Sequence, residues 1–323
     1  MEWLVIAWAG IIGFCVLMYV ILDGFTLGTG IMLCFLNKQE KDLSLSVILT
    51  TWDGNQTWLV LGLAALYGAF PSAFSFLLPV LYLPLLLMAI FLLFRGVIFE
   101  FRLKATGGQI YWDFLFIASS LWVAVIQGLV FGNVLEGFNS PHAFFSFFSC
   151  LCGIAVPCAY SLLGAARLVL KTSGPLQNKM EKRAFWLSLG ILFLLIILSF
   201  WFANIHPEAW ELWHEASYVP FLIGLPLLGC LGFMALWIGI FKHLDKLPYW
   251  GAVLVIFACY AGAGLALYPY AVPYQMDIFT AASEPNTLLF IFVGAAIMLP
   301  ILLLYTGYSY WIFRGKVKEV IHY

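Results

Sequence analysis

Long apolar runs separated by short polar stretches dominate this chain. If about 20 apolar residues make one membrane crossing, the pattern predicts nine helices, at residues 4–36, 54–70, 75–101, 111–132, 143–170, 184–204, 219–241, 249–269 and 286–313. The stretches between them are too short to form a separate domain. The pattern therefore predicts an all-α polytopic membrane protein, with residues 1–323 in a single integral membrane domain.

The composition supports this class of protein. Apolar residues make up 64% of the 323 residues and charged residues only 10%, whereas soluble domains average roughly 25% charged residues. A soluble fold of this length cannot bury so much apolar surface. The net charge of −1 gives no indication of a nucleic-acid partner.

Charged residues are divided between the two sides of the predicted helices. All fifteen Lys and Arg residues fall on one side: Lys38, Lys41, Arg95, Arg102, Lys104, Arg167, Lys171, Lys179, Lys182, Arg183, Lys242, Lys246, Arg314, Lys316 and Lys318. The other side holds Glu2, Glu136, Glu208, Glu211, Glu215, Asp277 and Glu284, and no basic residue. By the positive-inside rule, we expect the N-terminus outside and the C-terminus in the cytoplasm.

The helices suggest an internal duplication. Helices 1–4 (about 1–135) and helices 5–8 (about 140–270) could form two four-helix bundles, with the helix at 286–313 as a peripheral addition. Leu66–Pro71 ends one predicted helix and Leu267–Pro273 ends another with a related sequence.

Metal-ligand patterns are missing from the predicted helix interiors. The five histidines, at positions 142, 206, 214, 243 and 322, all lie in loops or near the terminus. Membrane b-type haems take axial His or Met ligands from helix interiors. We therefore expect no metal site in this chain, and any redox metal would belong to a partner.

Two acids interrupt the apolar runs. Asp23 lies within the first predicted helix and Asp53 precedes the second, both in the cytoplasmic half. An ionisable residue inside a membrane is costly, so it marks a functional site by default. With the weaker candidates Glu100 and Asp113 in the same zone, we expect a buried polar cluster that opens to the cytoplasm and conducts protons.

Structural roles remain open for the same residues. Asp53 could be the N-cap of its helix, and Asp113 could simply lie at the interface. Arg95 could form a structural ion pair with Glu100.

The other residues also keep alternatives. Asp23 could be purely structural, and Trp58 could pack in the interior or face lipid, a partner or a small apolar channel. Gly24 and Gly28 are spaced for close contact between helices.

Several blocks carry a resemblance to a known family. They are Val20–Phe25 with Leu27–Gly28, Trp52–Asn55 with Trp58, Phe94–Arg102, Gly132–Asn133, Leu267–Pro269 and Leu304–Thr306. In this order, over nearly the whole chain, they resemble subunit II of the bacterial cytochrome bd-type quinol oxidases.

The resemblance implies nine helices, as two four-helix bundles plus one. It also implies a heterodimer with a haem-bearing subunit I that ligates two b haems and one d haem. A small accessory subunit and a quinone bound to this chain are further possibilities. The complex would lie in the bacterial cytoplasmic membrane, oxidise quinol and reduce O2 to water, and build a proton gradient without pumping.

For this chain, the resemblance implies support of assembly and proton delivery from the cytoplasm through Asp23 and Asp53. It associates Trp58 with an oxygen path, while Arg95 is either part of that region or structural. Thr26 departs from the family, which commonly has a second Asp there, so more of the role falls on Asp23.

Two other functions fit the pattern. A proton-coupled secondary transporter is compatible with intramembrane acids and a possible repeat. A scaffold subunit with no relay of its own is the other alternative.

Overall fold

The structure, a computed structural model, describes residues 2–105, 107–138, 145–205 and 219–317. Eleven α-helices, a 3-10 turn and two short strands make up that part. They are α1 (Glu2–Met32), η1 (Leu33–Phe35), α2 (Lys38–Ile48), α3 (Trp52–Ala69), α4 (Pro71–Lys104), α5 (Gln109–Glu136), α6 (Phe147–Lys171), α7 (Pro175–Ile205), α9 (Val219–Phe241), α10 (Leu247–Leu267), β1 (Tyr270–Val272), β2 (Met276–Asp277), α11 (Ile278–Ala281) and α12 (Pro285–Ile312). Outside the described residues lie His142, His206, His214, His322, Glu208, Glu211, Glu215 and Lys318.

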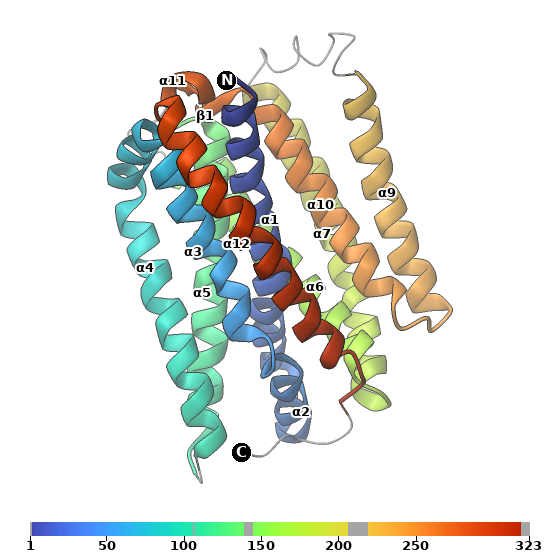
Figure 1. Cartoon of the computed structure of the whole chain (residues 1–323). Coiled ribbons are helices and arrows are strands. Elements are labelled where there is room, and N and C mark those ends of the chain that lie inside the picture. The colour runs from blue at the N-terminus through green and yellow to red at the C-terminus, as the bar shows by residue number, and fades with distance from the viewer. Residues whose placement is uncertain (1, 106, 139–144, 206–218, 318–323) are drawn as a thin grey trace.

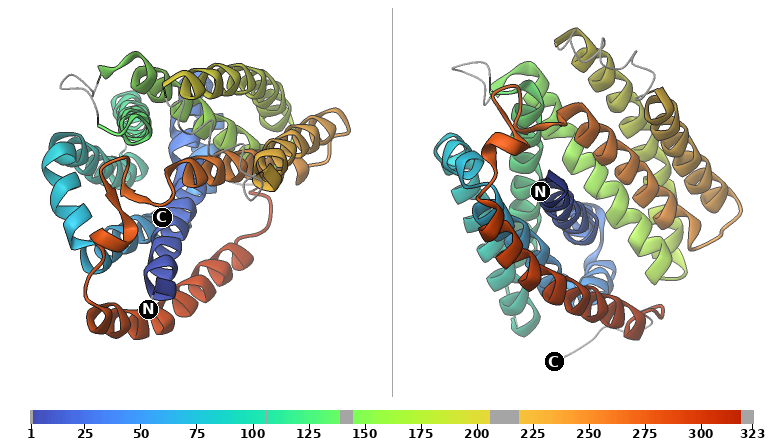
Figure 2. Two further views of the ribbon diagram at one scale, coloured as in Figure 1. Left: turned by 90° about the horizontal axis from the view of Figure 1, so that it is seen from above. Right: turned by 45° about the horizontal axis from the view of Figure 1, so that its top comes forward.

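Helix α1 occupies the centre of the molecule (Figures 1 and 2). It packs against α3, α5 and α6, while α4 packs on the outside of α5. On the other side, α9 and α10 pair with each other, and α6 joins them to α1 and α5. Helix α12 crosses obliquely over α3 and α1 (Figure 1). The residues of α1 are therefore placed to meet side chains from most of the chain.

Eight helices of the described part are long and apolar enough to cross a membrane. These are α1 extended by η1, α4, α5, α6, α7, α9, α10 and α12. The second predicted helix, at 54–70, is present as α3 but is not among the eight. Its first turns carry Asp53, Asn55 and Gln56, which lower its mean hydropathy. The all-α polytopic class is confirmed, whereas the division into two bundles stays a prediction.

Two of the predicted polar stretches are largely helical. Residues 37–53 contain α2, whose start is fixed by a capping box in which Asn37 and Glu40 each bond the other's backbone N–H. Helix α7 begins at Pro175 rather than at 184. Polar residues hid both helices from a prediction based on apolar runs. Strands β1 and β2 form a small antiparallel pair between α10 and α12.

Glycines bring α1 and α6 into direct backbone contact. A Cβ added at Gly28 would collide with the carbonyl group of Tyr160, and one at Gly164 would collide with the backbone of Gly28 and Thr29. A Cβ at Gly24 would lie 2.8 Å from the Tyr160 ring. The close helix contact expected from the spacing of Gly24 and Gly28 is thus present.

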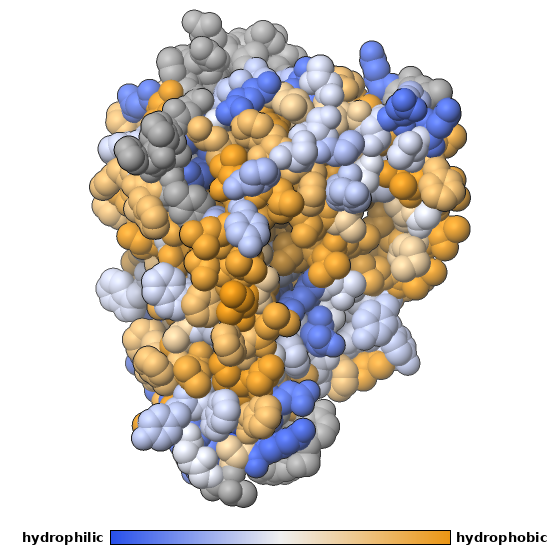
Figure 3. Space-filling model, turned by 90° about the vertical axis from the view of Figure 1, so that its left-hand side faces the viewer, coloured by the Kyte–Doolittle hydropathy of each residue, from blue (hydrophilic) through white to orange (hydrophobic). Residues whose placement is uncertain are grey.

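The outer surface is rich in apolar side chains. The face shown in Figure 3 is largely hydrophobic across its middle. On α4, for example, Leu83, Leu93 and Phe94 are 62%, 72% and 55% exposed. Contiguous apolar surface on this scale is suited to lipid or to another membrane subunit.

Candidate functional site

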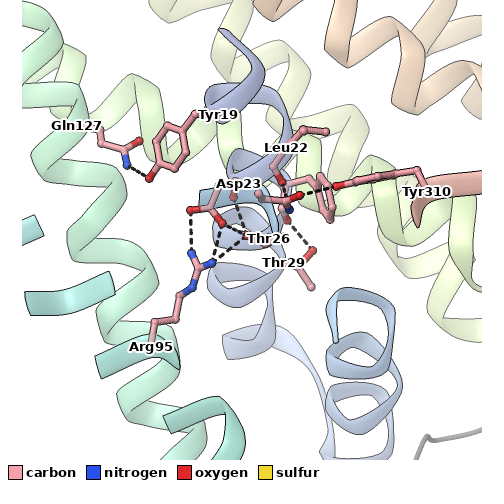
Figure 4. A network of polar contacts seen from close by, with 10 residues as sticks. Tyr19, Leu22, Asp23, Thr26, Thr29, Arg95, Gln127 and Tyr310 are labelled. Carbon is pink, nitrogen blue, oxygen red and sulfur yellow. Dashed lines mark hydrogen bonds and ion pairs between the residues drawn. The ribbon is translucent and has the colours of Figure 1, made fainter. Parts of the chain in front are cut away.

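Asp23 forms a fully buried ion pair with Arg95. Arg95 Nη2 lies 2.6 Å from Asp23 Oδ1, and Nη1 lies 3.3 Å from Oδ2. Thr26 Oγ1 lies 2.5 Å from Asp23 Oδ1 and accepts a further hydrogen bond from Arg95 at 3.2 Å. The three residues form the centre of the polar network in Figure 4. We call them the Asp23 cluster.

The helical period of α1 explains how the Asp23 cluster is assembled. Tyr19, Asp23 and Thr26 are four and three residues apart, so they share one face of α1. Gly24 and Gly28 occupy a neighbouring face and press against α6. The polar face is thereby turned towards α4 and α5, where Arg95 reaches it.

Two tyrosines and a glutamine extend the polar contacts beside Asp23. Gln127 Nε2 donates to Tyr19 Oη at 2.7 Å, and Tyr160 Oη donates to Gln127 Oε1 at 2.6 Å. Figure 4 shows the bond between Gln127 and Tyr19 beside Asp23. With the bond from Tyr160, the chain joins α1, α5 and α6. The Gln127 amide is half-buried, and with both of its groups bonded it fixes the orientation of both hydroxyl groups.

On the opposite side of α1, Asn55 ties α3 to α12. Its Nδ2 donates to the carbonyl oxygen of Leu22 at 2.7 Å, and Tyr310 Oη donates to its Oδ1 at 2.9 Å. Asn55 is 1% exposed, so these bonds satisfy an otherwise costly buried amide.

A second ionic cluster lies at the α2 end of the bundle. Asp113 on α5 pairs with Lys41 at 3.1 Å and with Arg102 at 2.9 Å. Arg102 also pairs with Asp42 at 2.5 Å. These four residues, the Asp113 cluster, join α2, α4 and α5. Asp113 is 5% exposed and Arg102 is 4% exposed, so this pair is buried within the described part of the chain.

At the same end of the bundle, Glu40 on α2 forms an ion pair with α7. Its Oε2 accepts a hydrogen bond from Lys179 at 2.8 Å. Burial raises the pKa of Glu40, but hydrogen bonds from Lys179 and from the Asn37 N–H outweigh it, so the pKa lies below its ordinary value.

Ser120 lies between the two clusters. Asp113, Ser120 and Gln127 follow one another at intervals of seven residues on α5, which places them on one face at steps of about 10 Å. Ser120 Oγ is buried without a hydrogen-bond partner in the described part of the chain. It lies against α1 where Gly30 leaves room, because a Cβ there would collide with the hydroxyl group. Polar groups thus run along α5 from one cluster to the other.

Two of the predicted relay acids lie outside both clusters. Glu100 is exposed on α4, where its partner is Lys104 at 3.6 Å, so the suggested ion pair between Arg95 and Glu100 is wrong. Asp53 is exposed in the first turn of α3. Thr51, not Asp53, is the N-cap residue, which corrects that alternative as well. We expected one polar cluster containing all four acids. The structure instead places Asp23 and Asp113 in two separate clusters and leaves Glu100 and Asp53 outside both.

Trp58 is fully buried, so the alternative in which it packs in the interior is confirmed and the lipid-facing alternative is wrong. Its exposed fraction is 0%, and it packs with Cys15, Tyr19 and Leu22. Phe14 meets its ring edge-on, with the ring centroids 5.7 Å apart. Its Nε1 has no hydrogen-bond partner among the described residues.

The donor set in the described part does not fit a haem. No group of three or more His, Cys, Asp or Glu residues that could hold a metal is found there. His243, the one histidine described, follows α9 and lies 3.0 Å from Glu181.

Predictions from the sequence missed Tyr19, Ser120, Gln127 and Tyr160. Ser120 and Gln127 follow Asp113 at successive intervals of seven residues, and this spacing was a usable signal for both of them. Tyr19 and Tyr160 gave no such signal, because a tyrosine in an apolar run also fits simple packing.

These features define a class: a multi-pass helical membrane protein with paired ionisable side chains at membrane depth. The chain belongs to a particular family, cytochrome bd terminal oxidase subunit II, whose family model matches residues 4–313. It is therefore a subunit of an oxidoreductase complex, and the expected family and enzyme class are confirmed.

Individual relatives cover almost the whole chain. Subunit 2 of the cytochrome bd-I ubiquinol oxidase of Escherichia coli (strain K12) is 26% identical over 361 residues, which is 97% of this chain and 94% of that protein. Subunit 2 of the cytochrome bd ubiquinol oxidase of Bacillus subtilis (strain 168) is 25% identical over 317 residues, 92% of each. The solved bd oxidase structure from Geobacillus thermodenitrificans shares the fold, with a TM-score of 0.76, 15% identity, and coverage of 97% of this chain and 99% of that chain.

Proposed function

We propose that this chain delivers protons from the cytoplasm to a haem-bearing subunit I while the complex oxidises quinol and reduces O2 to water. The observation that carries the proposal is the complete burial of Asp23 among polar groups within the membrane. Both relatives above are named as ubiquinol oxidase subunits, which supports quinol as the electron donor. The b and d haems would belong to subunit I, and a bound quinone or a small accessory subunit is compatible with this arrangement.

The proposed route runs from the Asp113 cluster to the Asp23 cluster. Asp113 lies at the ionic end of the bundle, paired with Lys41 and Arg102, and would take up its proton from cytoplasmic water. Water molecules and the Ser120 hydroxyl group would bridge the two clusters, because neither heptad step can be spanned by direct hydrogen bonds. At its end, Thr26 orients the Asp23 carboxylate and Arg95 balances its charge.

Glu100 and Asp53 have different places in this proposal. Glu100 is paired with Lys104 at the surface, which favours a surface ion pair over a relay. Asp53 is exposed on α3 beside Gly54, which lies near the α12 residue Tyr305. It would serve the route only if subunit I covers that face.

The orientation follows from the basic ends of the helices. Lys41, Arg102 and Lys179 lie in ion pairs at the α2 end, the side that the positive-inside rule assigns to the cytoplasm. We propose that the N-terminus is outside and that α3 is a ninth crossing, which its contacts with α1, α4 and α12 support. Its polar first turns would then face protein rather than lipid.

Two variants on neighbouring residues test the route. Ser120→Ala removes a hydroxyl group that bonds no described partner, whereas Ser119→Ala removes one that bonds its own helix at Phe116 O. We expect Ser120→Ala to lower oxygen consumption by about tenfold, equivalent to ~1.4 kcal/mol on the barrier. Ser119→Ala should keep normal turnover, and both complexes should keep their haem.

Equal turnover in the two variants would contradict the route through Ser120. Equal loss of haem and protein would indicate that α5 is only a scaffold. The family match favours the oxidase over a proton-coupled secondary transporter. A scaffold without a relay remains the alternative that these variants separate.

A further inference from the structure

Arg167 lies in a box of three aromatic rings. Its guanidinium carbon is 4.8 Å from the centroid of the Phe25 ring, 5.1 Å from that of Tyr249 and 5.2 Å from that of Tyr310. Phe25 meets the other two rings edge-on. The box therefore joins α1, α6, α10 and α12 around one positive charge.

This charge has no carboxylate partner among the described residues, although the other two buried arginines do. Arg95 pairs with Asp23, and Arg102 pairs with Asp42 and Asp113. Arg167 is only 7% exposed, and its Nε has no hydrogen-bond partner in the same part of the chain. Aromatic faces compensate a cation only in part, so the site still lacks an anion.

A second cation next to Arg167 increases the positive charge of the site. Lys171, one turn further along α6, is 5% exposed and donates to the carbonyl oxygens of Phe313 and Gly315. Val317 N donates to Lys171 O at 2.8 Å, so the segment after α12 wraps around the end of α6. Since Lys171 is held by carbonyl groups, Arg167 is the cation left to bind a ligand.

The depth of the box matches the level of lipid headgroups. Arg167 is four residues from the end of α6, a distance of about 6 Å along the helix. Tyr249 is two residues after the start of α10, and Tyr310 is two residues before the end of α12. All three residues therefore lie within about one turn of a helix end. Basic pockets between helices on the cytoplasmic side are suited to anionic headgroups.

We propose that Arg167 binds the phosphate group of an anionic phospholipid at the junction of α6, α10 and α12. The guanidinium offers planar N–H donors to phosphate oxygens, a geometry in which arginine is favoured. The bound phosphate group neutralises Arg167, the one buried arginine that has no carboxylate partner among the described residues. Its binding also stabilises the packing of α12 on the bundle.

The test measures the unfolding temperature, Tm, of the purified oxidase complex after bulk lipid has been removed. Dioleoyl-phosphatidylglycerol, dioleoyl-phosphatidylcholine or inorganic phosphate is then added. We expect phosphatidylglycerol to raise the Tm by about 3 °C or more, and the other two to leave it unchanged. Arg167→Gln should lose more than half of that rise. The matched control, Arg314→Gln, removes an exposed arginine stacked on Trp311 and should keep the rise.

Four results would overturn the proposal. An equal rise with phosphatidylcholine removes the need for a negative headgroup, and a rise with inorganic phosphate alone makes the site one for the free anion. Equal losses in Arg167→Gln and Arg314→Gln indicate general surface charge. No rise in the wild-type complex points instead to a carboxylate of the partner subunit.

A second variant covers the case in which Arg167→Gln does not assemble. Arg167→Lys keeps the charge but loses the planar fork, so its rise with phosphatidylglycerol should be smaller than that of the wild type. A rise equal to that of the wild type would contradict specific binding by the guanidinium.

Discussion

Arg95 on α4 donates to both carboxylate oxygens of Asp23 on α1, and both side chains are sealed from solvent, at 2% and 0% exposure. The pair joins two helices through residues that are 72 positions apart in sequence. Breaking a buried pair by removing one partner costs roughly 3–5 kcal/mol, whereas replacing both partners is often close to neutral. This asymmetry allows the structural and proton-transfer roles of Asp23 to be separated.

The first prediction concerns a double-mutant cycle on this pair. Asp23→Asn and Arg95→Gln should each lower the yield and Tm of the complex, because each leaves an uncompensated buried charge. The double variant should recover the Tm and the haem content. Oxygen consumption should stay low in the double variant, because Asn cannot accept and release the proton. If turnover returns together with stability, Asp23 is purely structural.

The second prediction concerns the contact between α1 and α6. Gly28→Ala should destabilise the complex by about 1–3 kcal/mol or more, because its Cβ would overlap the carbonyl group of Tyr160. Gly10→Ala in the same helix is the matched control, since nothing outside its own stretch of helix lies within 4 Å of its added Cβ. Thermal unfolding followed by haem absorbance measures the difference. Equal Tm values would contradict the close approach.

The third prediction concerns the pH dependence set by Glu40. Its pKa lies below the ordinary value of 4.5, so the stability it contributes is present above that pH and is lost as the pH falls through the lower folded-state value. Glu40→Gln should therefore lower the Tm at pH 7, and its difference from the wild type should shrink as the solution is acidified below 4.5.

Glu100→Gln is the control for this pH series. Glu100 belongs to an exposed pair with Lys104, and such pairs contribute little. Its Tm should follow that of the wild type at every pH. A constant difference between Glu40→Gln and the wild type across the series would exclude linkage to Glu40.

The fourth prediction concerns Trp58. Trp58→Ala should cost about 3–5 kcal/mol through the cavity it leaves. Trp58→Phe should lower the Tm much less, because it leaves a smaller cavity and the lost indole Nε1 bonds no described partner. An oxygen path along this residue, which the family resemblance implies, would show separately. In that case Trp58→Phe would raise the apparent KM for O2, whereas a purely structural role would lower only the Tm.

The sequence predicted the positions of those helices whose length is set only by the thickness of the membrane. The predicted runs at 219–241, 249–269 and 286–313 match α9, α10 and α12 to within two residues, because about 20 apolar residues are needed to cross the bilayer. The search for apolar runs missed helix that is polar in sequence, namely α2 and the first turns of α7. The Asn37 and Glu40 capping box was the signal that would have revealed α2.

The sequence by itself determined that Asp23 is exceptional, because a carboxylate in an apolar run is costly whatever surrounds it. It did not determine the partner of Asp23. Glu100, five residues from Arg95 on the same helix, was the nearer acid, yet α4 turns Glu100 outwards and Arg95 towards α1. Only tertiary packing decides this, because the partner of a side chain depends on which helix faces meet. Here the bare backbone at Gly28 and Gly164 presses α1 onto α6 and leaves the Asp23 face to α4 and α5.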